Sequence, residues 1–81
     1  MELREFAEFL VKSIVKDPET VKVQEFGGEE NTVILEIIVH SSDMGLVIGR
    51  GGKMANSIRT LIQAQAYLQG RNKVNINFDS Y

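Results

Sequence analysis

The stretch that decides the fold is Gly45-Leu46-Val47-Ile48-Gly49-Arg50-Gly51-Gly52-Lys53, residues 45–53 of the 81-residue chain. It carries three glycines within four positions, although glycine costs about 1 kcal/mol relative to alanine inside a helix. Glycine is favoured where the backbone turns sharply or where a ligand approaches it closely. A turn that opens onto a helix N-terminus also offers unpaired N–H groups and the positive end of the helix dipole. With Arg50 and Lys53 beside it, this segment is a candidate anion-binding loop.

Two common nucleotide-binding motifs do not fit the same segment. A P-loop needs glycine, four residues and then Gly-Lys-Ser/Thr, but Gly52-Lys53 is followed by Met54, and Val47 stands where the first glycine is required. A G-x-G-x-x-G fingerprint starting at Gly49 would need glycine at the position of Met54, and no strand leads directly into the loop. The sequence therefore predicts neither of these nucleotide sites.

The patterns on both sides of the loop predict an α+β domain. Apolar residues at helical spacing precede Asp17-Pro18, which stops the first helix. Two β-rich runs surround a glycine-rich turn at 27–31, and strict alternation marks a last strand. Gly70 ends the long helix, with 71 and 72 continuing the turn. The predicted elements are a helix over 2–16, strands over 20–26 and 32–39, helices over 44–48 and 53–69, and a strand over 73–79.

Within this order, Val47-Ile48-Gly49-Arg50-Gly51-Gly52 resembles the V-I-G-x-x-G signature of the KH domain. The surrounding strand–helix–loop–helix–strand, about 33–78, matches the expected KH core. The additional helix and strand over 2–26 give the order αββααβ, which resembles the bacterial type II arrangement. Over 1–81 the chain looks like the small single-KH-domain proteins of the KhpA (YlqC) family. One departure is Ala55, where many KH signatures carry isoleucine, and Ile58 could supply the neighbouring core contact.

This resemblance implies a fold and a function. The fold is a three-stranded mixed sheet with the helices packed on one face. The function is non-catalytic binding of single-stranded RNA, or DNA, by a G-x-x-G loop that holds about four nucleotides. Bases would lie over an apolar groove whose floor lies near Ile37 and Val39, and the loop segment offers no aromatic residue for stacking. The predicted RNA-binding residues are Met44, Val47, Ile48, Gly49, Arg50, Gly51, Gly52, Lys53, Asn56 and Arg59.

Charge and composition set the limits around this interpretation. The net charge is −2, but residues 1–36 carry −5 and residues 37–81 carry +3, so the loop lies in the basic half. There is no cysteine and one histidine, His40, which we interpret as a surface or capping residue; neither a metal nor a cofactor is expected. Acidic residues such as Asp43 are interpreted as solvated charges, which leaves no acid–base pair for an enzyme. No apolar run reaches membrane-spanning length, so a cytoplasmic protein is expected.

The long helix also predicts self-association. Its apolar residues cover an arc of about 160°, wider than the roughly 100° stripe of an ordinary amphipathic helix, and two glutamines lie inside the arc. The predicted dimer residues are Ile58, Ile62, Gln65, Ala66 and Gln69. The alternative is that the sheet covers the whole arc and the glutamines reach its rim. The resemblance implies a homodimer, a larger Jag-type KH-containing partner and a role as RNA chaperone or post-transcriptional regulator. The alternative function is a protein-interaction scaffold.

Overall fold

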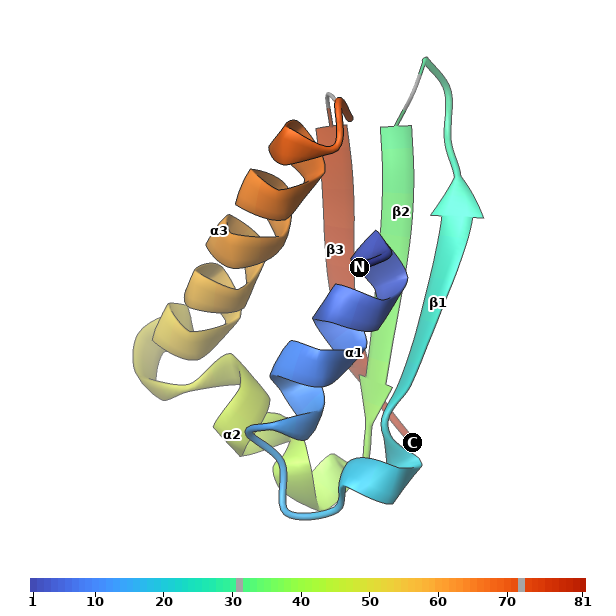
Figure 1. The fold of residues 1–81 in the computed structure, drawn as a ribbon. Helices are drawn as coiled ribbons and strands as arrows, with labels where there is room; N and C mark the ends of the chain where they lie inside the picture. The colour runs from blue at the N-terminus through green and yellow to red at the C-terminus, as the bar shows by residue number, and fades with distance from the viewer. Residues whose placement is uncertain (31, 72) are drawn as a thin grey trace.

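The computed structural model describes residues 1–30, 32–71 and 73–81. The predicted turn positions 31 and 72 lie outside the described residues. The predicted order αββααβ is found, with short 3₁₀ turns at Pro18–Thr20, Ser41–Asp43 and Arg50–Gly52 (Figure 1). The helices are α1 (Leu3–Lys12), α2 (Met44–Ile48) and α3 (Lys53–Leu68), and the strands are β1 (Lys22–Gly27), β2 (Thr32–Val39) and β3 (Lys73–Ser80).

The sheet is mixed, as predicted, with the strand order β1-β2-β3. Strand β1 runs antiparallel to β2 and strand β3 runs parallel to it, so that Leu35 lies opposite both Glu25 and Ile76. A parallel neighbour requires a long crossover connection, and the segment from α2 to α3 supplies it. The crossover places the glycine-rich loop between two helices on the helical side of the molecule (Figure 1).

All the helices cover one face of this sheet, which confirms the predicted layering (Figure 1). The alternation of β2 directs four buried side chains into the core beneath them, Val33, Leu35, Ile37 and Val39. The intervening Ile34 and Ile38 stay half-buried on the uncovered face. Strand β2 is therefore the central strand of the sheet, with helices on one of its two apolar faces.

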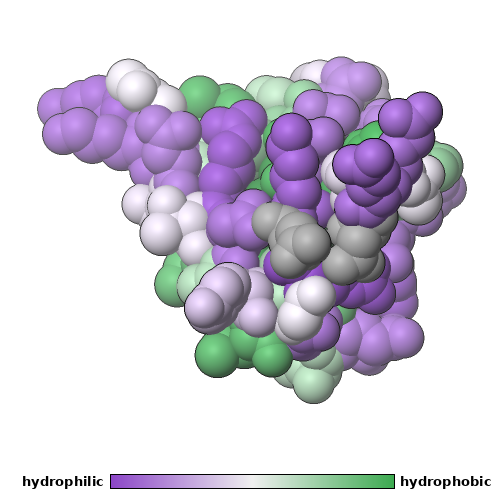
Figure 2. Space-filling model, turned by 90° about the horizontal axis from the view of Figure 1, so that it is seen from above, coloured by the Kyte–Doolittle hydropathy of each residue, from purple (hydrophilic) through white to green (hydrophobic). Residues whose placement is uncertain are grey.

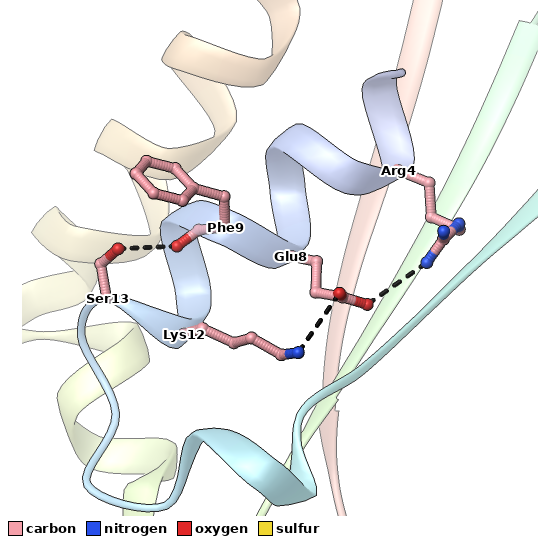
Figure 3. Close-up of polar contacts among 5 residues, drawn as sticks. All are labelled: Arg4, Glu8, Phe9, Lys12 and Ser13. Atoms are coloured by element: carbon pink, nitrogen blue, oxygen red, sulfur yellow. Dashed lines mark hydrogen bonds and ion pairs between the residues drawn. The ribbon is translucent and has the colours of Figure 1, made fainter. Parts of the chain in front are cut away.

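Helix α1 is shorter than predicted because it ends at Lys12 and not at Lys16. Glu8 pairs with Arg4 at 3.2 Å and with Lys12 at 3.3 Å, and the Ser13 hydroxyl donates to the Phe9 carbonyl at 2.7 Å as the helix ends (Figure 3). The buried residues of α1 are Leu3, Ala7 and Val11. The chain then passes through the 3₁₀ turn at Pro18–Thr20 before β1 begins at Lys22.

The prediction that Asp43 is a solvated charge is wrong. Only 1% of its surface is exposed, and its side chain does not cap α2. Its carboxylate accepts the backbone N–H groups of Lys16 at 3.2 Å and of Asp17 at 3.1 Å, and so holds the α1–β1 connection against the start of α2. His40 is the capping residue instead, because its ring nitrogen accepts the Ser42 N–H.

Candidate nucleic-acid interface

The glycine-rich loop joins α2 to α3 through a tight 3₁₀ turn. Gly49, Gly51 and Gly52 have φ values of +77°, +61° and +79°, which lie in the region that favours glycine. A Cβ at Gly49 would lie 2.6 Å from the Cβ of Met54, so this glycine is required by the close packing of the loop on α3. A Cβ at Gly51 or Gly52 would meet nothing within 4 Å, so at these two positions the backbone faces open space.

The positive charge beside this loop is available to a ligand. Arg50 and Lys53 are both exposed, and within the described part of the chain neither makes an ion pair. Helix α3 begins after Gly52 with no side-chain cap, so the positive end of its dipole faces the loop. Open backbone, two cations and a helix N-terminus therefore lie together at one edge of the molecule.

The structure separates the predicted groove residues into two groups. Met44 and Ile48 are half-buried, and Asn56 and Arg59 are exposed on the first turns of α3. Val47, in contrast, is completely buried, as are Ile37 and Val39. The prediction that these three side chains contact bases is wrong, because they face the core between the helices and the sheet. Val47 instead fixes α2, and with it the loop, to that core.

A groove between α3 and β3 replaces the predicted floor. It has a volume of about 820 Å³ and runs along the flank of α3 toward the end of that helix. Tyr67 lines it with 78% of its surface exposed, so an aromatic side chain is available after all. The helical periodicity could show that the α3 residues of this groove lie outside the buried stripe of the helix. That they form one wall of a groove depends on β3, which lies parallel to β2 and beside α3. The lining residues are Arg59, Thr60, Gln63, Ala64, Tyr67, Leu68, Val74 and Ile76.

The predicted dimer residues do not form one surface. Ile58, Ile62 and Ala66 are buried in the core, so the prediction that they form an interface is wrong, because this strip of α3 packs on the sheet. Gln65 is half-buried, and Gln69 is exposed and donates its amide to the Met1 carbonyl at 2.9 Å. The surplus width of the apolar arc comes from Met54, Leu61 and Leu68, which remain exposed.

Neither a metal-binding cluster nor a membrane-spanning helix is found among the described residues. Among residues 1–30, 32–71 and 73–81, no cluster of three or more histidine or acidic side chains could hold a metal ion. The helices of the described residues are all too short or too polar to cross a membrane. Figure 2, viewed from above, shows that the end where α3 stops and β3 begins is mostly hydrophilic.

The αββααβ order, the mixed sheet covered on one face and the glycine loop between α2 and α3 define a type II KH domain. Within that class, the chain belongs to the family described as KhpA/KhpB, KH domain, whose model matches residues 4–78. The family is not enzymatic, which confirms that prediction.

Curated relatives and solved structures agree with this assignment. An RNA-binding protein KhpA of Clostridium perfringens is 43% identical over 72 residues, covering 89% of this chain and 95% of that protein. The RNA-binding protein KhpA of Borreliella burgdorferi is 48% identical, and the match covers 76% of this chain and 74% of that protein. The KhpA of Chlamydia pneumoniae is 34% identical, and the match covers 95% of this chain and 94% of that protein.

Among solved structures, an Aquifex aeolicus Era variant bound to GDP and AlF₄⁻ superposes with a TM-score of 0.62 at 19% identity. Era in complex with MgGDPNP and a segment of 16S ribosomal RNA gives a TM-score of 0.64 at 20% identity. Each match covers all of this chain but 32% of the Era chain, so it shows the shared fold alone.

Proposed function

We propose that this protein binds single-stranded RNA without catalysis, clamping the phosphate backbone with Gly49, Arg50, Gly51 and Gly52. The observation that carries the proposal is the loop itself, where two glycines with open space at their Cβ positions lie beside two cations that make no ion pair with the described residues. Curated relatives that cover most of the chain are RNA-binding proteins. A G-x-x-G loop in a KH domain holds about four nucleotides by their backbone.

Each loop residue has a separate task in the proposed clamp. Gly49 packs the turn against Met54, whereas Gly51 and Gly52 let a phosphate approach the peptide backbone. Arg50 and Lys53 then add charge-assisted hydrogen bonds to the phosphate oxygens. Because these contacts recognise backbone and not base edges, they supply affinity with little sequence preference.

The bases would extend from the loop into the groove between α3 and β3. This groove is apolar along Val74 and Ile76 and carries Tyr67 near its far end. One short loop and one groove give modest affinity, which a second RNA-binding chain would increase through avidity. We therefore include in the proposal a role as RNA chaperone or post-transcriptional regulator in the cytoplasm, acting as a dimer or with a larger Jag-type KH protein.

A double substitution tests the clamp. Arg50→Asp with Gly51→Asp places carboxylates where phosphates would lie, so RNA retention in a filter assay should be lost while circular dichroism is unchanged. A matched control is the double variant Lys22→Asp with Gly70→Asp, which changes the net charge by the same amount. Gly70 lies just after the C-terminal end of α3, and like Gly51 it has a positive φ (+79°) and open space at its Cβ position. If the loop variant retains RNA as well as the control does, the clamp proposal fails.

The helix layer favours a second candidate function, protein interaction. An apolar helix-layer patch consists of Phe9 (58% exposed), Met54, Leu61 (50% exposed) and Leu68 (78% exposed), on the neighbouring helices α1 and α3. Self-association through this patch is tested by measuring the molar mass of the double variant Phe9→Asp with Leu61→Asp by light scattering. The control is Asn75→Asp, on the uncovered face of the sheet. Loss of a dimer only in the patch variant would support self-association. A wild-type monomer would exclude it.

A further inference from the structure

Arg59 has surroundings that set it apart from the other basic residues near the loop. Its guanidinium carbon lies 5.0 Å from the centroid of the Phe78 ring, across the space between α3 and β3. Its Nη1 donates to the Asn56 side-chain oxygen at 3.3 Å. Within the described part of the chain no carboxylate pairs with it. The cation is thus held by an aromatic ring and a neutral amide, which fix its position without neutralising its charge.

The location of Arg59 is equally specific. It lines the groove between α3 and β3 and also a second hollow of about 400 Å³, lined further by Ile34, Val74, Asn75, Ile76 and Asn77. The side chain therefore lies where the two hollows meet, and it remains exposed. A planar guanidinium has two faces, and only one of them can lie on Phe78. The other face is accessible to a ligand in the groove.

We propose that Arg59, supported by Phe78, is a stacking platform for one purine base of the bound strand. This inference rests on the proposed RNA-binding function and assigns a base subsite that the glycine loop does not provide. A guanidinium is planar, weakly hydrated and stacks on π-systems, which a lysine ammonium does not do. A base placed on its free face would complete a Phe78–Arg59–base stack, and purines offer the larger π-face.

The distance from the clamp fits such a role. Arg59 follows Lys53 by six residues on α3, which corresponds to about 9 Å along the helix axis. A base attached to the clamped backbone can therefore reach the platform. Asn75 and Asn77 line the adjoining hollow and carry amide donors and acceptors suited to the edge of a base. Arg59 would thus contribute base preference, whereas Arg50 and Lys53 contribute phosphate contacts.

Arg59→Lys separates stacking from charge, because it keeps the cation and removes the plane. The probes are an oligoadenylate, an oligouridylate and an abasic ribose-phosphate strand, each of about ten nucleotides so that a four-nucleotide KH clamp fits on each. We expect Arg59→Lys to weaken oligoadenylate binding about tenfold and oligouridylate binding less, in line with base–aromatic stacking energies. Binding of the abasic strand should change less than twofold, within about the error of a titration, and the salt dependence of oligoadenylate binding should stay the same.

Phe78→Leu should weaken oligoadenylate binding in the same direction and by less, again without affecting the abasic strand. Equal oligoadenylate binding by wild type and Arg59→Lys would overturn the proposal. So would equal losses on the oligoadenylate and abasic strands in Arg59→Ala, because they would show a phosphate contact. If the loop variant Arg50→Asp with Gly51→Asp loses all three strands while Arg59→Lys is neutral, only the stacking subsite fails. If wild type binds none of the strands, both proposals fail.

Discussion

Gly49 and Met54 touch across the turn that joins α2 to α3, since a Cβ on Gly49 would lie 2.6 Å from the Met54 Cβ and 2.8 Å from its backbone nitrogen. The first glycine of the loop is therefore structural, and the later two are free to serve a ligand. Because glycine has no Cβ, the loop can hold three residues of positive φ in four positions. The division between one structural and two free glycines predicts that the glycines respond differently to the same substitution.

Gly49→Ala should destabilise the fold more than Gly52→Ala does. Both place a side chain at positive φ, which costs about 1–2 kcal/mol, but Gly49→Ala adds overpacking worth about 1–3 kcal/mol. The difference is measurable as a lower urea midpoint at an unchanged m-value. Equal midpoints for the two variants would show that the contact with Met54 relaxes freely.

Asp43→Ala should lower the free energy of unfolding by about 2–3 kcal/mol, because it removes the buried carboxylate that accepts the backbone N–H groups of Lys16 and Asp17. Asp43→Asn should cost less, since the amide oxygen still accepts one of them. Asp79→Ala is the control, an exposed aspartate whose loss should change stability by no more than about 0.5 kcal/mol. Chemical denaturation compares the three, and similar values for Asp43→Ala and Asp79→Ala would contradict the proposed clasp.

Ile62→Asp and Leu61→Asp should behave very differently although the residues are neighbours. Ile62 is fully buried against the sheet, so a carboxylate there should cost about 4 kcal/mol or more and unfold so small a domain. Leu61 is half exposed, and Asp there should cost about 1 kcal/mol or less. Thermal melts followed by circular dichroism distinguish the two, and a folded Ile62→Asp would show that α3 packs through another face.

These contrasts show what the sequence could predict. The β-rich run at 32–39 and the glycine-rich segment were sufficient to predict β2 and the loop, because each is a local pattern. The helical wheel of α3 showed a wide apolar arc but not which part of it meets the sheet, so buried Ile62 and exposed Leu61 were indistinguishable. The groove was missed for a related reason, because it requires β3 to lie parallel to β2 beside α3. Asp43 was missed because its partners lie 26 and 27 residues away.

Lys53→Ala should reduce the salt dependence of RNA binding. For a single strand, each phosphate contact contributes about 0.7 to the slope of log K against log salt. Removing one contacting lysine should lower the slope by that amount, whereas Lys22→Ala on β1 should leave it unchanged. Fluorescence anisotropy over a salt series measures both slopes. A slope unaffected by Lys53→Ala would remove this lysine from the phosphate contacts.

The most direct test of the central claim is an NMR titration of the wild-type protein with a short single-stranded RNA. Phosphate clamping at the loop predicts that the backbone amide signals of Gly49–Lys53 shift first and most. Signals of the groove residues Gln63, Ala64 and Tyr67 should follow, and those of Glu36 and Ile38 on the uncovered face should stay in place. Shifts confined to the uncovered face of the sheet or to the helix-layer patch, with the loop unperturbed, would contradict the account.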